Sequence, residues 1–340
     1  MSNIIVRNAT RSVDLVWRHL KITKSLDEIC HTLDVELSPA EFSKVRRHDK
    51  IEVRYENPIV RDSGGQRRVT TVRVDEITAV VDKSKHNIKV IGRSPARDII
   101  DSTWSGMLAE MTLRDVVREI GKDFGITCDT FPTDKPDSSG TVHDFTWNDE
   151  SPWAKIVTEA DTQHFIFTSN EAGNLYLWKV NTSLRDEGFH VSEGVNMISA
   201  EWKENGAEQF NKYIVTGGGE TSGDVIDSTC PGKRVLTINV PDPLVSQAEL
   251  TARAETELRR RKETETIVVV PGWGLTDTQI KKLHPITKGK EVFWVPNILI
   301  PVTIPSLGLK RNLLISAVQQ EATQASLSTT LTLVNREKYL

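Results

Sequence analysis

Residues that could bind a metal or act as reactive thiols are scattered along this sequence. The eight histidines never approach the His-x-x-x-His or His-x-His spacing of a zinc site. Cys30, Cys128 and Cys230 lie far apart, and an odd, scattered set of cysteines argues against a disulfide framework. We therefore expect reduced structural thiols and no metal site.

Motifs for nucleophilic catalysis and for phosphate binding are missing from the sequence as well. It contains no Gly-x-Ser-x-Gly elbow of a serine hydrolase. The glycine-rich run 217–223 falls short of the dinucleotide fingerprint and carries Glu220 where phosphates would lie. Residues 231–234 lack the upstream glycine and the Ser or Thr of a phosphate-binding loop. We predict no catalytic residue and no cofactor.

Acidic residues are numerous, and no pair of them stands out as a general acid and base. Asp98 and Asp101 lie three residues apart and follow Arg93 and Arg97. Alternating charges at this spacing are typical of a salt-bridged surface turn, which we prefer to an active site.

Five residues are candidates for contact with a subunit or partner. Arg259, Arg260 and Arg261 end a predicted helix, where they either complement the helix dipole or face a partner. Trp273 and Trp294 either anchor a partner or pack in the core. Both interpretations stay open for each group.

Length, charge and hydropathy exclude several classes of protein. A chain of 340 residues is long enough for two or more domains. A net charge of -4 and a pI of about 6.1 give no electrostatic reason for tight nucleic-acid binding. The first residues lack a signal-peptide pattern, and the longest apolar run, 292–304, is too short to span a bilayer. We expect a soluble protein without a membrane-spanning segment.

Hydrophobic periodicity predicts strands over most of the chain. Residues 1 to about 91 alternate apolar and polar residues without a helix, which favours a small antiparallel barrel or sandwich. Strand patterns return after residue 178, at 196–202, 212–216, 234–240, 264–270, 291–304 and 313–334. Polar turn residues separate the early strands, notably at 62–65.

Three helices carry recognisable start signals. Thr112 opens a capping box whose helix ends at Gly125, and Ser151 followed by proline opens a second helix. A hairpin around Gly173 follows it, after a polar loop at 134–140. Ser246 opens the third helix, which ends in the arginine run.

The order of these elements predicts a mainly β fold with α/β insertions. We expect a first β block at 1–95 and an α/β domain with two helices and a hairpin at 96–178. A second β block at 179–245 is completed by 291–340 and interrupted by a helix-plus-strand insertion at 246–290.

Several features recur together in one protein family. They are Gly92-Arg93 with the run 98–101, the capped helix at Thr112, the segment 168–175, Arg259–Arg261, Gly272-Trp273, and Trp294 to Asn297. In this order and approximate spacing, the chain resembles the Mu-type baseplate hub protein of contractile-tailed bacteriophages and the hub part of related spike proteins. The resemblance covers nearly the whole chain.

The resemblance implies two small antiparallel β-barrel domains plus helix-containing domains, trimerising into a pseudo-sixfold ring. It implies a homotrimer that contacts the central spike protein, tail tube or tube-initiator proteins, the tape measure protein and other baseplate proteins. DNA would only pass through the ring. Such a protein would be assembled in the host cytoplasm and would reside in the baseplate of the virion tail.

Two other functions remain as alternatives. One is a different tail-tip binding or adhesin-like β protein of a non-contractile tail. The other is a tail-associated cell-wall hydrolase, which the missing catalytic motifs disfavour.

Overall fold

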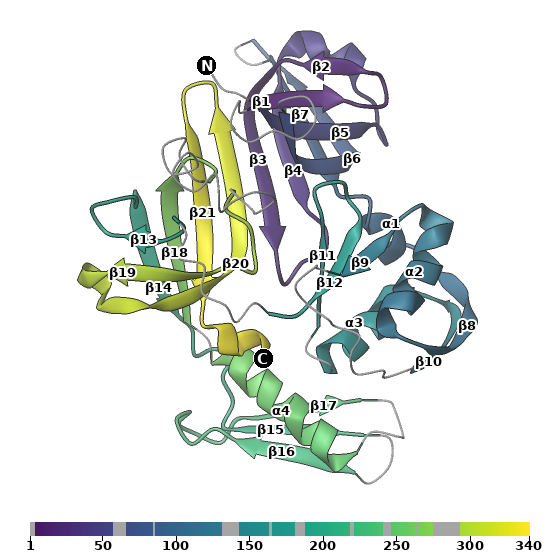
Figure 1. The fold of residues 1–340 in the computed structure, drawn as a ribbon, viewed down its shortest axis with the longest axis vertical. Coiled ribbons are helices and arrows are strands. Elements are labelled where there is room, and N and C mark those ends of the chain that lie inside the picture. The colour runs from purple at the N-terminus through teal and green to yellow at the C-terminus, as the bar shows by residue number, and fades with distance from the viewer. Residues whose placement is uncertain are drawn as a thin grey trace.

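The computed structural model describes residues 4–56, 66–83, 86–130, 143–162, 165–180, 188–217, 221–240, 246–262, 264–274 and 293–340. The predicted turn at 62–65, the polar loop at 134–140, Glu220 and most of the insertion after residue 274 lie outside these ranges. Figure 1 shows a large sheet flanked by two smaller units that contain the helices.

One sheet of thirteen strands holds strands from both ends of the chain. Its N-terminal strands are β1 (Ile4–Asn8), β2 (Val13–Leu15), β3 (Trp17–Ser25), β4 (Thr32–Leu37), β5 (Lys50–Glu56), β6 (Gln66–Val81) and β7 (His86–Arg93). Its C-terminal strands are β13 (Val191–Ser192), β14 (Ser199–Glu204), β18 (Thr264–Pro271), β19 (Leu299–Ile304), β20 (Leu309–Thr323) and β21 (Leu327–Val334).

Strand β3 joins strand β20 and thereby unites the two halves of the sheet. The antiparallel register runs from Ala317 opposite Ser25 to Thr323 opposite His19. In Figure 1 the purple β3 and the yellow β20 accordingly lie side by side. The two β blocks expected as separate barrels therefore form one sheet, which stays open between β14 and β2 in the described residues.

The two halves of this sheet repeat the same arrangement of five strands. The N-terminal half has the order β3-β4-β7-β6-β5, and the C-terminal half has the order β14-β18-β21-β20-β19. All pairings within both sets are antiparallel. Corresponding strands also follow the same order along the chain, so each half is one copy of a structural repeat.

Alternation of side chains gives the repeats one buried face. In β3 and β4, Leu20, Ile22, Leu33 and Val35 point into the core, while their neighbours along each strand are half-buried or exposed. The same period occurs in β18 and β21, and these residues belong to one hydrophobic cluster that spans both halves. Burial of one face fixes the register, because a slip by one residue would expose the apolar set.

An α/β unit follows β7 and links the two repeats. It contains α1 (Arg97–Ile100), β8 (Trp104–Met111), α2 (Leu113–Phe124), β9 (Cys128–Thr130), β10 (His143–Glu150), α3 (Pro152–Thr162), β11 (Ile166–Ser169) and β12 (Leu175–Trp178). Thr112 caps α2 by accepting a hydrogen bond from the Asp115 amide, and Gly125 ends the helix with a φ of 66°. Helices α2 and α3 and the β11–β12 hairpin are where the sequence predicts them, whereas α1, β8, β9 and β10 were not predicted.

A second unit is inserted between β14 and β18. Strands β15 (Lys212–Thr216), β16 (Ser222–Ile226) and β17 (Val235–Asn239) form a small sheet that packs on α4 (Gln247–Arg261). Tyr213, Val215, Leu250 and Ala254 form its separate core. This unit, called the α4 unit below, unites strands expected in the second β block with the helix expected in the insertion.

Short 3-10 helices complete the fold, which is mainly β with α/β insertions, as predicted. They are η1 (Pro39–Lys44), η3 (Pro305–Leu307) and η4 (Arg336–Tyr339). Among the described helices, none is long and apolar enough to cross a membrane.

A buried histidine lies where the N-terminal repeat meets the α/β unit. His31 Nδ1 is 3.3 Å from Thr70 Oγ1, and the His31 carbonyl accepts a hydrogen bond from the Ser94 amide. Burial and the nearby Lys24 charge lower the pKa of His31 well below its ordinary value, against a backbone hydrogen bond at Ser169 that raises it. The imidazole is therefore neutral in the folded protein.

This burial predicts a loss of stability in mild acid. Below the unfolded pKa of about 6.5, His31 binds a proton in the unfolded chain but not in the folded protein. The contribution of neutral His31 to the free energy of unfolding is therefore fully present above that pH and decreases as the pH falls below it. One such group contributes a slope of up to about 1.4 kcal/mol per pH unit. Urea unfolding of the His31→Gln variant between pH 7 and pH 5 should lack this slope, whereas His86→Gln, at an exposed position, should keep it. Equal slopes for all three proteins would contradict the assignment.

Candidate assembly surfaces

The described residues contain no group of three or more histidine, cysteine, aspartate or glutamate side chains that could hold a metal. Cys30, Cys128 and Cys230 are buried free thiols. Burial is the main cause that raises the pKa of Cys30, which makes the thiolate rarer at neutral pH.

Trp273 and Trp294 pack inside the chain itself. Each is only 3% exposed, and both belong to the core that spans the two repeats. The indole N–H of Trp273 donates to the Glu321 carbonyl at 2.9 Å, and Trp294 makes an edge-on contact with Phe189. Neither ring offers surface to a partner, so core packing is the interpretation that the structure supports.

The three arginines lie at the carboxyl end of α4, as predicted. A cavity of about 650 Å³ opens beside them, with lining residues that include Lys203, Glu208, Arg260, Arg261, Glu265 and Lys338. The lining mixes both signs of charge and joins the α4 unit to the end of β14, the start of β18 and the C-terminal η4. An interface role for Arg259, Arg260 and Arg261 stays a prediction.

Part of the arginine run is bound within the helix. Glu257 is buried and pairs with Arg253 at 2.8 Å and with Arg261 one turn later. Arg259 lies 3.8 Å from Glu255, and Lys262 lies 3.2 Å from Asp227. Burial alone would raise the pKa of Asp227, but hydrogen bonds from Thr229 and Lys262 outweigh burial and lower it. The three pairs among residues 253–261 lie within α4, whereas the Lys262–Asp227 pair ties the helix end to the residue that follows β16.

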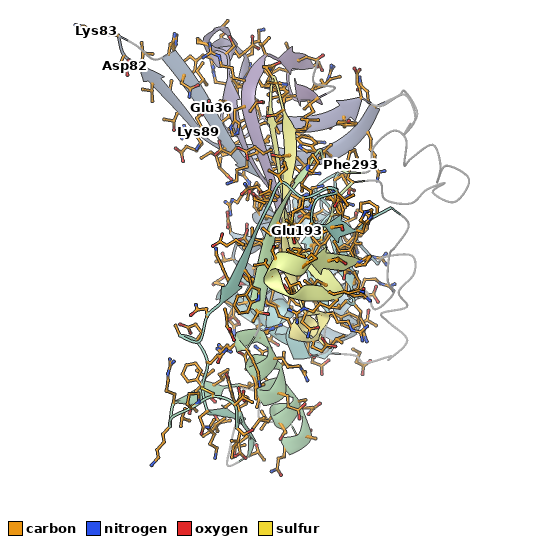
Figure 2. All side chains as sticks on the ribbon, turned by 90° about the vertical axis from the view of Figure 1, so that its left-hand side faces the viewer. Glu36, Asp82, Lys83, Lys89, Glu193 and Phe293 are labelled. Atoms are coloured by element: carbon orange, nitrogen blue, oxygen red, sulfur yellow. The ribbon has the colours of Figure 1, made fainter. Side chains whose placement is uncertain are left out.

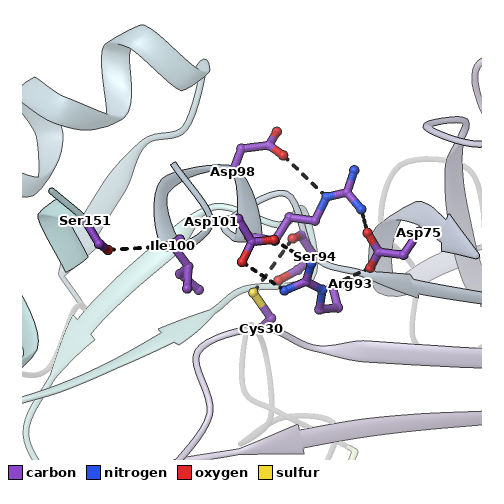
Figure 3. Close-up of polar contacts among 9 residues, drawn as sticks. Cys30, Asp75, Arg93, Ser94, Asp98, Ile100, Asp101 and Ser151 are labelled. Atoms are coloured by element: carbon purple, nitrogen blue, oxygen red, sulfur yellow. Dashed lines mark hydrogen bonds and ion pairs between the residues drawn. The ribbon is translucent and has the colours of Figure 1, made fainter. Parts of the chain in front are cut away.

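A charged cluster fastens the α/β unit to the N-terminal repeat (Figure 3). Arg93 on β7 contacts Asp75 on β6 at 3.0 Å and Asp101 after α1 at 2.6 Å. Arg97 contacts both Asp75 and Asp98. The salt-bridged turn expected from the sequence is confirmed, and its role is structural.

The face of the sheet opposite the core carries many polar side chains in both repeats. In the N-terminal repeat it carries His19, Lys21, Asp34, Glu36 and Lys89, which alternate with buried neighbours. In the C-terminal repeat it carries Gln319, Glu321 and Thr330. Mixed charges with hydroxyl and amide groups make a surface without a strong single-sign field.

The end of the β6–β7 hairpin projects beyond the sheet (Figure 2). Beyond Arg73, the last residue of β6 paired with β5, strand β6 pairs only with β7 in the described chain. Residues 78–83 are exposed on both faces, and Val81 is 71% exposed. We call β6 residues 76–81 the arm. Its outer edge presents backbone donors and acceptors that a further strand can use.

The other long open edge of the sheet is β14. Among the described strands it pairs only with β18, from Ser199 opposite Val269 to Glu204 opposite Thr264. Trp202 in this strand is 46% exposed, and Val195 and Ile198 just before it are exposed as well. The sequence analysis identified both strands but gave no sign that their edges are open, because edge status depends on which strands pair.

Solved structures with the same fold come from phage tails and from a secretion system. The 43 kDa tail protein of prophage MuSo2 from Shewanella oneidensis is 21% identical with a TM-score of 0.75, over 99% of this chain and 98% of that chain. The tail protein from Neisseria meningitidis is 14% identical with a TM-score of 0.77, over the same shares. A third is an E. coli component of the type VI secretion system, described as similar to the T4 bacteriophage tail proteins gp27 and gp5. It is 7% identical with a TM-score of 0.58, over 96% of this chain and 76% of that chain.

At these identities the similarity establishes the fold, which this chain shares with the two phage tail proteins and the secretion-system component. The resemblance stated from the sequence is confirmed at this level. Neither a protein-family model nor a curated protein matches the sequence.

The ion pairs of α4 predict a local loss of stability on mutation. Glu257→Ala leaves two partly buried arginines without their carboxylate and should destabilise the α4 unit by about 1–3 kcal/mol. Glu255→Ala, at an exposed pair in the same helix, should cost less than about 0.5 kcal/mol. Amide hydrogen exchange in β15 to β17 measures the effect, because the unit has its own core. Equal exchange in the two variants would show that the buried pairs contribute nothing.

Proposed function

We propose that this chain is a structural baseplate hub subunit of a phage tail. Three copies form a ring that joins the threefold central spike to the sixfold tail tube and surrounds the channel for tape measure and DNA. Its partners are further copies of itself, the spike, tail tube or tube-initiator proteins and neighbouring baseplate proteins, in the virion tail.

The repeat of five strands within one chain is the observation that carries this proposal. A closed ring of three chains contains six such repeats, each presenting the same strand order. The ring then has threefold symmetry in its sequence and inserted units, and nearly sixfold symmetry in its β-strands. A protein that binds a threefold partner on one side and a sixfold partner on the other needs both symmetries.

The polar face of the sheet supports a position around a channel. Its mixed charges in the N-terminal repeat and its Gln319, Glu321 and Thr330 in the C-terminal repeat give no basic track along which phosphates would be held. A conduit for DNA needs such a surface, because many lysine and arginine contacts would bind the passing DNA. Shared fold with phage tail proteins over 99% of the chain agrees with this role.

The proposal makes a direct prediction about mass. Three chains of 38.1 kDa each give about 114 kDa in light scattering. This mass is expected because head-to-tail contacts, which join two different surfaces of neighbouring copies, close into a ring after three chains. Electron microscopy of that species should show a central opening. A stable dimer would contradict the proposal, since twofold symmetry does not build this ring. A monomer that persists in the presence of the cognate spike would contradict it too.

A further inference from the structure

Within the described residues, the arm and β14 are long open edges of the sheet. Alternating arm residues Ile77 and Ala79 lie opposite Val90 and Ile88 of β7, whose side chains are in the core. The core face of the repeat therefore continues onto the arm, where no described strand covers it. Exposed edges of this kind pair readily with another strand, and native proteins rarely leave them free.

The chain already contains the contact that such an edge would make. In the C-terminal repeat, β20 corresponds to β6, and its distal half pairs with β3. Both strands carry a register shift at the same place, between Ile315 and Ala317 in β20 and between Val74 and Glu76 in β6. The partner β3 is the N-terminal counterpart of β14. The β3–β20 contact is thus a template for joining β14 to the arm.

The pairing registers translate this template residue by residue. When the register shifts of β6 and β20 are aligned, Ala79 matches Gln320. Their partners match too, because Ala79 pairs with Ile88 and Gln320 pairs with Thr329. The same match is carried from β21 through β18 to β14 in the C-terminal repeat, and from β7 through β4 to β3 in the N-terminal repeat. Trp202 of β14 then corresponds to Ile22 of β3. Gln320 lies opposite Ile22 within the chain.

We propose that β14 of one copy pairs antiparallel with the arm of the next copy, with Trp202 opposite Ala79. The inference rests on the proposed trimer and names the surfaces that close it. In the same register Glu201 lies opposite Val80 and Lys203 opposite Thr78. Three such contacts make one sheet continuous around the ring and leave neither edge open.

The side chains on β14 and on the arm are compatible with this pairing between copies. Trp202 and Ala79 lie on the core face of their repeats, so the exposed indole covers the small side chain and the apolar arm. Glu201 and Val80 lie on the opposite, polar face. The interface joins two different surfaces of one chain, which is the kind of contact that closes a ring rather than a dimer.

Engineered cysteines test the register. Directly opposite residues in antiparallel strands have Cβ atoms about 4.5–5.5 Å apart, close enough for a disulfide after small adjustments. The full chain with Val80→Cys and Glu201→Cys should form covalent dimers and trimers on oxidation, seen in non-reducing denaturing gels. Cross-linked chains accumulate over time, so the experiment also detects an assembly that only a small fraction of the chains form at any moment.

A matched pair provides the control. Val80→Cys with Ala200→Cys places the second thiol one residue away and on the other face of the sheet, so it should not cross-link. Equal cross-linking of both pairs would overturn the proposed register. A 114 kDa species without the expected link would overturn this interface while the hub function stands. Monomers without any link, even with the spike present, would overturn both.

Trp202→Ala provides an independent test. Loss of the central aromatic ring should raise the concentration at which the trimer dissociates by about tenfold or more. Val235→Ala removes another exposed apolar side chain, in the α4 unit outside this interface, and should leave dissociation unchanged. An unchanged trimer in the Trp202 variant would contradict the proposed burial of this residue.

Discussion

The pairing of β3 with β20 is the constraint on which the rest of the structure depends. It joins residues 19–25 to residues 317–323 through a continuous antiparallel register. Both strands are central in the sheet, so the pairing places the two repeats side by side and merges their cores into one cluster. Because the strands come from opposite ends of the sequence, the helix-containing units between them have to leave the sheet, and the chain returns to it after each.

The two units with helices are placed where the sheet permits an excursion. The α/β unit occupies the connection between the two repeats, and the α4 unit occupies the connection between β14 and β18. Each has its own core. Arg93 and Arg97 fasten the α/β unit to the sheet, whereas Lys262 pairs with Asp227 inside the α4 unit. The repeats keep their strand order because neither unit interrupts a strand pairing within them.

The same geometry explains why a single chain has unsatisfied edges. Inside the chain, the distal half of β20 in the C-terminal repeat pairs with β3, the first strand of the N-terminal repeat. Strand β14, at one end of the sheet, and the arm, the distal part of β6, lack such a neighbour within the described residues. A repeat that needs a neighbour on each side is satisfied only in a closed array, and this requirement connects the fold to the proposed ring.

Local structure was largely determined by the sequence itself. Capping boxes at Thr112 and Ser246 and the alternation in β3 and β4 predicted elements correctly, because such signals act within one or two turns or along one strand. Tertiary structure alone decided which strands pair, that both β blocks share one sheet, and that Trp273 and Trp294 are buried. It also decided that β15, β16 and β17 form a small sheet that packs on α4 rather than join the large sheet. These outcomes depend on contacts between distant residues, which periodicity along the chain does not encode.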